Sequence, residues 1–97
     1  MMNLPEKVKI CEVGLRDGLQ NEKTIPTTDQ KLELLRGVIE AGYPVIEVGS
    51  FMHPKRVPQM ADTDELFKRI GDVPEGVELR ALIPNVRGVQ RAFDCGC

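Results

Sequence analysis

Three short apolar segments occur along the chain, each followed by a longer stretch in which apolar residues recur at helical spacing. The apolar segments cover residues 8–13, 45–48 and 79–83, and they are rich in β-branched and aliphatic residues, which is typical of buried strands. Each is followed by a residue that interrupts regular structure, namely Gly14, Gly49 and Pro84. We therefore predict three strands.

The longer stretches predict three helices. In the first, side-chain oxygens at Thr27–Asp29 can accept the free backbone N–H groups of a helix start, and Gly42 is placed to end the helix. The second opens at Asp62, and the third begins near Val86. The positions expected on the apolar sides are Leu32, Leu35 and Ile39, then Leu66, Phe67 and Ile70, and finally Val89 and Phe93.

This alternation is the α/β pattern, in which parallel strands are joined by right-handed crossovers. The strands begin at Val8, Val45 and Leu79, so successive units are 37 and 34 residues long. A (β/α)8 barrel (TIM barrel) of ~250 residues averages about 31 residues per unit. The spacing suits the amino-terminal three βα units of such a barrel, although a doubly wound sheet has the same order of elements. We expect residues 1–97 to form part of a domain roughly three times longer.

The composition excludes several classes of function. Lys and Arg total 13 against 15 Asp and Glu, a net charge of −2, which provides no basic field for nucleic acid or for an anionic membrane. No apolar run approaches the roughly 18 residues of a membrane-spanning helix. Residues 1–7 lack the pattern of a signal or transit peptide. We expect a soluble, cytoplasmic protein with no nucleic-acid or membrane partner.

The three cysteines, Cys11, Cys95 and Cys97, predict reduced thiols rather than a disulfide framework, because their number is odd and their spacing irregular. As a metal site, Cys95 and Cys97 would lack further ligands, since the only histidine, His53, is far away in sequence. We interpret these two cysteines as ordinary small residues near a helix end.

Candidate chemistry lies where the predicted strands end, which is where barrels gather their functional residues. Glu12 and Glu47 each interrupt an apolar strand near its carboxyl end, where a carboxylate is costly to bury without a partner. Each is either a ligand or acid–base group, or a carboxylate that pairs with Arg16 to organise the mouth of the barrel. The third strand is followed by Pro84 and Asn85.

The dipeptide Arg16-Asp17 follows the first strand and is flanked by Gly14 and Gly18, which we expect to let the backbone turn sharply. Both side chains then reach one cavity. A divalent cation prefers carboxylate oxygen, and a developing enolate oxygen is stabilised by a fixed cation. The alternative is a surface ion pair in a turn.

Basic side chains also follow the second and third strands, and His53 lies where a substrate would meet the second loop. They either contact an anionic ligand or solvate one face of the molecule. The basic residues concerned are Lys55, Arg56, Arg87 and Arg91.

Residues 12–22, with the sequence EVGLRDGLQNE, closely resemble the signature of the 3-hydroxy-3-methylglutaryl-CoA lyase family of metal-dependent TIM-barrel lyases and Claisen-type synthases. The resemblance runs from about residue 7 to about residue 92. The synthases typically carry Glu-Gln where this chain has Leu19-Gln20, which favours the lyases. Further matches are Val45–Glu47, Ser50-Phe51, Pro54-Lys55, Val57–Met60 and Pro84-Asn85.

The resemblance implies a retro-Claisen cleavage of 3-hydroxy-3-methylglutaryl-CoA to acetyl-CoA and acetoacetate, the chemistry of leucine degradation. A base removes the C3 hydroxyl proton, the C2–C3 bond breaks, and the acetyl-CoA fragment leaves as an enolate. Mg²⁺ or Mn²⁺ would chelate the hydroxyl and carboxylate oxygens of the substrate. The partner is thus a small acyl-CoA, and a homodimer of the full-length protein is compatible with the resemblance.

The resemblance also implies roles for five side chains. Asp17 matches the metal-ligand aspartate, and Arg16 matches the arginine that binds the substrate and stabilises the enolate oxygen. Glu47 matches an active-site glutamate that either handles a proton or positions Arg16. Gln20 is expected to contact the substrate, and Glu12 to support the site.

Other parts that the resemblance implies are absent from these 97 residues: a His-x-His pair, an asparagine from a later strand and a cysteine in a glycine-rich loop. We therefore expect the metal site to be incomplete and the isolated chain to be inactive. Two alternatives remain at this point: a related synthase that condenses an acyl-CoA with a 2-oxo acid, and a non-catalytic, truncated remnant.

Overall fold

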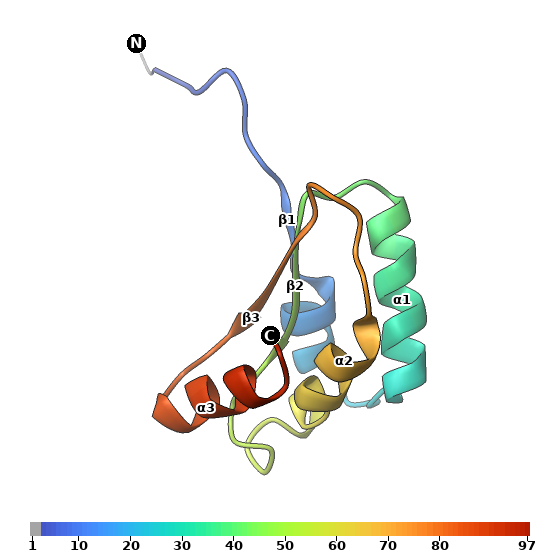
Figure 1. Cartoon of the computed structure of the whole chain (residues 1–97), viewed down its shortest axis with the longest axis vertical. Coiled ribbons are helices and arrows are strands. Elements are labelled where there is room, and N and C mark those ends of the chain that lie inside the picture. The colour runs from blue at the N-terminus through green and yellow to red at the C-terminus, as the bar shows by residue number, and fades with distance from the viewer. Residues whose placement is uncertain (1–2) are drawn as a thin grey trace.

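The computed structural model describes residues 3–97 and confirms the predicted order of strands and helices. Met1 and Met2, part of the segment inspected for a signal peptide, lie outside the described residues. Figure 1 shows the strands beside a layer of helices. The elements are β1 (Cys11–Glu12), η1 (a π-helical turn, Gly14–Gly18), α1 (Thr28–Glu40), β2 (Val45–Ser50), η2 (a 3-10 turn, Pro58–Met60), α2 (Thr63–Ile70), β3 (Glu78–Leu82) and α3 (Val86–Asp94).

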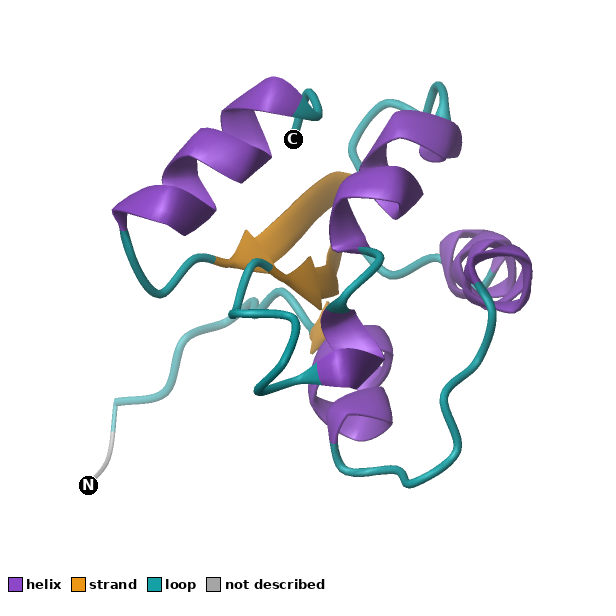
Figure 2. Cartoon of the chain, turned by 90° about the horizontal axis from the view of Figure 1, so that it is seen from below, coloured by secondary structure: helices purple, strands orange, loops and turns teal. Residues whose placement is uncertain are grey.

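The three strands form a parallel sheet in the order β1-β2-β3, and the helices lie along one side of it (Figure 2). On that side Ile46 and Val48 of β2 pack against a cluster of leucines, Leu15, Leu32, Leu35 and Leu66. The opposite face carries Glu47 and, paired with it in register, the exposed Arg80 of β3. The sheet therefore buries one face under helices and leaves the other face, which carries Glu47 and Arg80, without helices, as the strands of a TIM barrel do.

The first strand is much shorter than the predicted residues 8–13. Only Cys11 and Glu12 pair with β2, opposite Val45 and Ile46, whereas Val8 and Ile10 are 75% and 61% exposed. The physical reason is the register: β2 begins at Val45, so the residues before Cys11 have no strand beside them to accept their backbone hydrogen bonds. The β-branched composition was thus a poor guide to the length of this strand.

The second strand does not end at Gly49, as predicted, but continues to Ser50 through an irregularity in the register between Glu47 and Gly49. Gly49 is required there by space, because a Cβ on it would lie 2.7 Å from Oγ1 of Thr63. The same hydroxyl accepts the backbone N–H of Ser50 at 3.2 Å. The glycine therefore lets the start of α2 approach the strand instead of stopping the strand.

The third helix buries a different face from the one predicted. Val89 and Phe93 are 56% and 82% exposed, and the helix instead packs Ala92 and the neighbouring Cys95 against Phe51. Small residues allow this close contact: a Cβ on Gly88 would lie 3.2 Å from the carbonyl oxygen of Phe51. All three cysteines are free, as the sequence predicted.

The first helix begins as expected, with a capping box in which the side chain of Thr27 accepts the Gln30 N–H and the Gln30 side chain accepts the Thr27 N–H. It ends at a glycine with a positive φ, Gly42 at 94°. With 13 residues, α1 is the longest helix in residues 3–97. No helix in this part of the chain is long and apolar enough to cross a membrane.

Lys31 of α1 is buried, with only 2% of its surface exposed. Its Nζ donates to Oδ1 of Asp62 and to the carbonyl oxygen of Gln59, both at 2.5 Å. Asp62 also accepts from the hydroxyl of Thr28 at 2.6 Å, and the Gln59 side chain donates to the carbonyl oxygen of Glu22 at 2.9 Å. This network joins the loop after β1 to the loop after β2.

We predict that this buried pair contributes far more to stability than the exposed pair between Arg69 and Asp29, which joins the same two helices. Asp62→Asn leaves the buried ammonium of Lys31 without its counter-charge and is expected to cost about 3–5 kcal/mol of unfolding free energy. Arg69→Ala, the matched control, is expected to cost less than about 1 kcal/mol. The measurement is denaturant unfolding of the complete gene product, and equal losses for the two variants would contradict the assignment.

Candidate functional site

Backbone hydrogen bonds hold the turn that follows β1, and three of them share one carbonyl group. The oxygen of Val13 accepts the backbone N–H groups of Arg16, Asp17 and Gly18 at 3.1, 2.8 and 3.3 Å. Leu15, in the middle of the turn, is 1% exposed and belongs to the core beneath the helices. The two charged residues that follow Leu15 therefore extend from a turn that is anchored in the core. Short π-helical turns of this kind are frequent at functional sites.

The glycines that flank the dipeptide do not act as predicted, because neither Gly14 nor Gly18 has a positive φ. Gly14 is needed for space instead. Its N–H donates to Oε1 of Glu12 at 2.8 Å, and a Cβ on it would lie 2.8 Å from that same oxygen. At Gly18 a Cβ would meet nothing within 4 Å. The sharp turn is thus produced by the π-helical hydrogen bonds and not by left-handed glycines.

Arg16 and Glu47 form the central contact of the site. Nε of Arg16 donates to Oε1 of Glu47 at 2.5 Å, and the two side chains are 22% and 19% exposed. The contact spans from the turn after β1 to the middle of β2, residues that are 31 positions apart. Partial burial strengthens the attraction relative to a pair in open solvent. The carboxylate of Glu47, which interrupts the apolar strand β2, is therefore paired with the positive charge of Arg16.

Asp17 lies next to this pair. Its Oδ1 is 3.7 Å from Nη1 of Arg16, its side chain is 58% exposed, and its backbone carbonyl accepts from the Asn21 side chain at 2.8 Å. The structure thus brings three of the predicted site residues together around the guanidinium of Arg16. Within residues 3–97 no three His, Cys, Asp or Glu side chains lie close enough to hold a metal ion. Asp17 offers one hard oxygen ligand, which suits Mg²⁺ or Mn²⁺ but does not complete a site.

Glu12 is not brought together with Glu47. Because Glu12 pairs with Ile46 in register, it lies on the helix side of the sheet, whereas Glu47 lies on the open face. The Glu12 carboxylate lies beside α1, near Gln30 and Glu33, and accepts the N–H of Gly14. Its contacts are those of a residue that shapes the turn carrying Arg16.

Gln20 follows the turn and is partly buried. Its Oε1 atom is inaccessible to solvent and has no hydrogen-bond partner within the described residues. A buried amide oxygen without a donor is uncommon in folded proteins. Because the protein itself covers this oxygen, the observation does not test the predicted contact between Gln20 and the substrate.

The remaining predicted residues lie apart from the Arg16 turn. His53 is exposed in the loop after β2, and Asn85 is the N-cap of α3, where its Oδ1 accepts the Gly88 N–H at 2.8 Å. Burial raises the pKa of the Cys97 thiol, with a further contribution from Cys95, so Cys97 stays protonated at neutral pH. The buried pair of Lys31 and Asp62, which joins the loops beside the site, was not predicted from the sequence.

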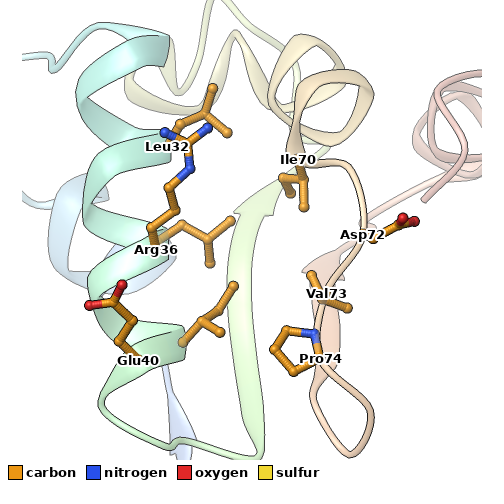
Figure 3. Close-up of a pocket in the computed structure, with 9 residues that line it drawn as sticks. Leu32, Arg36, Glu40, Ile70, Asp72, Val73 and Pro74 are labelled. Carbon is orange, nitrogen blue, oxygen red and sulfur yellow. The ribbon is translucent and has the colours of Figure 1, made fainter.

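A cavity of about 220 Å³ between α1 and residues 70–74 is separate from this site (Figure 3). Its lining combines the core residues Leu32 and Ile70 with the charged Arg36 and Glu40. It lies within the helix layer, on the opposite side of the sheet from Glu47. We therefore do not assign the candidate chemistry to it.

Comparison with known proteins shows what this chain resembles. The model of the HMGL-like family matches residues 7–97. The mitochondrial hydroxymethylglutaryl-CoA lyase of Rattus norvegicus is 50% identical over 96 residues, and the 3-hydroxy-3-isohexenylglutaryl-CoA/hydroxy-methylglutaryl-CoA lyase of Pseudomonas aeruginosa is 50% identical over 95 residues. These alignments cover 99% and 98% of this chain but only 29% and 31% of the relatives.

Solved structures show the same similarity. The hydroxymethylglutaryl-CoA lyase of Pseudomonas aeruginosa superimposes with a TM-score of 0.89 at 48% identity, covering 98% of this chain and 31% of that one. An HMG-CoA lyase of Acinetobacter baumannii, solved in complex with coenzyme A and 3-methylmalate, has a TM-score of 0.88 at 35% identity, covering 99% and 31%. From the match over residues 7–97 and from the parallel βα units, we conclude that the chain belongs to the HMGL-like family of TIM-barrel enzymes.

Proposed function

We propose that the protein containing this chain is a hydroxymethylglutaryl-CoA lyase, which cleaves 3-hydroxy-3-methylglutaryl-CoA to acetyl-CoA and acetoacetate. The observation that carries the proposal is the contact of 2.5 Å between Arg16 and Glu47, with Asp17 beside it, at the end of the first strand. Identity of 50% to lyases over nearly the whole chain supports it. Because the chain spans about 30% of those relatives, the activity belongs to a longer polypeptide.

In this reaction Arg16 stabilises the enolate. When the C2–C3 bond breaks, its electron pair moves toward the thioester carbonyl, whose oxygen becomes negative, while C3 becomes the ketone carbon of acetoacetate. A permanently charged guanidinium held in one orientation stabilises that oxygen without having to reorganise during the reaction. The enolate then takes up a proton at C2 to give acetyl-CoA, which balances the proton lost from the C3 hydroxyl.

Glu47 is best suited to positioning Arg16. Its Oε1 is committed to Nε of that arginine, which leaves the terminal nitrogens of the guanidinium for the substrate. An arginine side chain has many rotamers, and a partly buried partner restricts them before substrate binds. Of the two roles that the sequence left open, we therefore propose positioning instead of proton transfer.

Asp17 would supply one ligand of a divalent cation, Mg²⁺ or Mn²⁺. Its carboxylate is mostly exposed and is held near Arg16 by an anchored turn, so one oxygen remains free for a cation. A bound cation would polarise the hydroxyl and carboxylate oxygens of the substrate and make the hydroxyl more acidic. Residues 3–97 contain no cluster of side chains that could complete the metal site. The further ligands must therefore come from other parts of the protein.

Gln20 is proposed to contact the substrate because it belongs to the motif of residues 12–22. An acyl-CoA is supported by the Acinetobacter baumannii neighbour, whose structure contains coenzyme A. A homodimer of the full-length protein and a cytoplasmic location remain predictions from the sequence.

The proposal predicts that the complete gene product, given 3-hydroxy-3-methylglutaryl-CoA and Mg²⁺, releases acetoacetate and acetyl-CoA in equal amounts, and that a chelator abolishes this. The isolated 97-residue chain, with its single metal-ligand candidate, is expected to give no measurable turnover. Product analysis by chromatography checks both. Formation of free CoA from acetyl-CoA and a 2-oxo acid, without cleavage of the C2–C3 bond of 3-hydroxy-3-methylglutaryl-CoA, would instead assign the protein to the synthases, and no reaction in either direction would favour a non-catalytic remnant.

We also predict that Arg16→Gln lowers kcat in the complete gene product by about three orders of magnitude or more, because the enolate loses its fixed counter-charge. Arg69→Gln, which removes an exposed arginine from the outside of α2, is the control and is expected to retain kcat within about twofold. Steady-state kinetics at saturating substrate measure the difference. A loss of only a few-fold for Arg16→Gln would remove this residue from the transition state.

A further inference from the structure

The open face of the sheet carries a second pair of charged side chains beside Glu47. Arg80 of β3 pairs in register with Glu47 of β2, so the two side chains extend from the same face of neighbouring strands, which run ~4.8 Å apart. Glu78 lies two positions before Arg80 in β3 and therefore shares this face. Nε and Nη2 of Arg80 donate to the two carboxylate oxygens of Glu78 at 3.1 and 3.2 Å. Two parallel hydrogen bonds thus hold Arg80 in one orientation next to Glu47.

This charged pair is unusual for its place in the fold. The open face is the one that a TIM barrel turns inward, and barrel interiors are filled mainly by bulky branched apolar residues. An ion pair in such a place is costly to desolvate, and its replacement by apolar residues of similar volume is often neutral or stabilising. The stability of the barrel therefore gives no reason for Arg80 and Glu78, whereas their place beside the contact of Arg16 with Glu47 does.

Glu47 lies between two guanidinium groups. Its Oε1 accepts from Nε of Arg16, whereas its second oxygen, Oε2, accepts no hydrogen bond from residues 3–97. Nη1 of Arg80 likewise donates to no acceptor within the described part of the chain. Because β2 is the middle strand, Arg16 approaches the carboxylate from the β1 side and Arg80 lies on the β3 side. Both sides of the Glu47 carboxylate therefore face positive charge.

The charges along this face alternate in sign. From β3 toward the turn after β1 they are those of Glu78, Arg80, Glu47, Arg16 and Asp17. The hydrogen bonds and the charge of Glu78 raise the pKa of Arg80, and the charge of Glu47 raises it further. The hydrogen bonds and the charge of Arg80 in return lower the pKa of Glu78, so that this pair stays ionised at neutral pH. Arg80 therefore presents a permanent positive charge to Glu47.

We propose that Arg80 is a second positioning residue of the site and acts through Glu47. Its charge attracts the Glu47 carboxylate from the β3 side, so that the carboxylate keeps the orientation in which Oε1 accepts from Arg16. The two hydrogen bonds to Glu78 keep Arg80 from turning fully toward Glu47 and displacing Arg16. The effect on catalysis rests on the proposed function, in which Arg16 stabilises the enolate, whereas the positioning of Arg16 does not.

The first test is Arg80→Met in the complete gene product, because methionine keeps much of the length of the side chain and removes its charge. We expect kcat for 3-hydroxy-3-methylglutaryl-CoA to fall by about three- to tenfold with KM within about twofold, since Arg16 is held less firmly while substrate binding is retained. Arg80→Lys, which keeps the charge, is expected to recover most of the lost kcat. Arg36→Met, which removes an exposed arginine of α1 from the helix side of the sheet, is the control and is expected to leave kcat unchanged. An unchanged or higher kcat for Arg80→Met would overturn the proposal.

A double-mutant cycle shows whether Arg80 acts through Glu47. In a Glu47→Gln background the carboxylate is gone, and Arg80→Met is then expected to lower kcat by less than about twofold. The same loss with and without the carboxylate would show that Arg80 acts on the substrate directly or through the fold alone, and would overturn the proposal. Arg80→Gln, which is also uncharged, replaces Arg80→Met in both tests if the methionine variant does not fold.

NMR spectroscopy of the complete gene product separates this proposal from the proposed function, because it needs no turnover. In the wild type we expect an Nε–H signal of Arg16, assigned by its loss in Arg16→Gln, that lies downfield and exchanges slowly with water because the group donates to Glu47. Arg80→Met is expected to shift this signal upfield and to speed its exchange, whereas Arg36→Met leaves it unchanged.

The outcomes of this measurement are distinct. An identical Arg16 signal in Arg80→Met and in the wild type would overturn the proposal, and so would the absence of the signal from the wild type. A shifted signal with unchanged kcat would overturn the role of Arg80 in the reaction. If the wild type releases no acetoacetate, the proposed function fails, while the Arg16 signal still decides whether Arg80 positions that residue.

Discussion

The pairing of Arg16 with Glu47 is the interaction on which the candidate site depends. A carboxylate within the apolar strand β2 is costly to bury alone, and a flexible arginine cannot present a fixed charge without a partner. Their contact of 2.5 Å satisfies both requirements at once. Hydrogen bonds to the Val13 carbonyl oxygen and the burial of Leu15 in the core fix the turn that carries Arg16. The position of the Arg16 guanidinium therefore follows from the packing of the core.

The two faces of the sheet have different roles. The helix side contains the apolar core and the buried ion pair of Lys31 and Asp62, which joins the loops after β1 and β2. The open side and the carboxyl ends of the strands carry the charged residues of the candidate site, with Asp17 beside Arg16 and Glu47. Arg91, which donates to Asp64 and to the carbonyl oxygen of Met52, joins α3 to α2 and to the loop after β2.

The order of elements was predictable because strand composition, helix caps and hydrophobic spacing are local signals. Arg16, Asp17 and Glu47 were found from their positions at strand ends, and the structure brings them together. The predictions that were wrong concern features that are set by residues far away in sequence. The length of β1 is set by where β2 begins, and the buried face of α3 is set by its contact with Phe51. Lys31 was missed because a lysine next to apolar positions is read as solvent-exposed until its carboxylate partner is known.

The most direct test of this account is a double-mutant cycle on Arg16→Gln and Glu47→Gln, measured as kcat/KM for 3-hydroxy-3-methylglutaryl-CoA in the complete gene product. If Glu47 acts by positioning Arg16, Glu47→Gln lowers kcat/KM by about tenfold or more on its own, and by less than about twofold once Arg16 is already glutamine. The same loss in both backgrounds would show that the two residues act independently and would contradict the account.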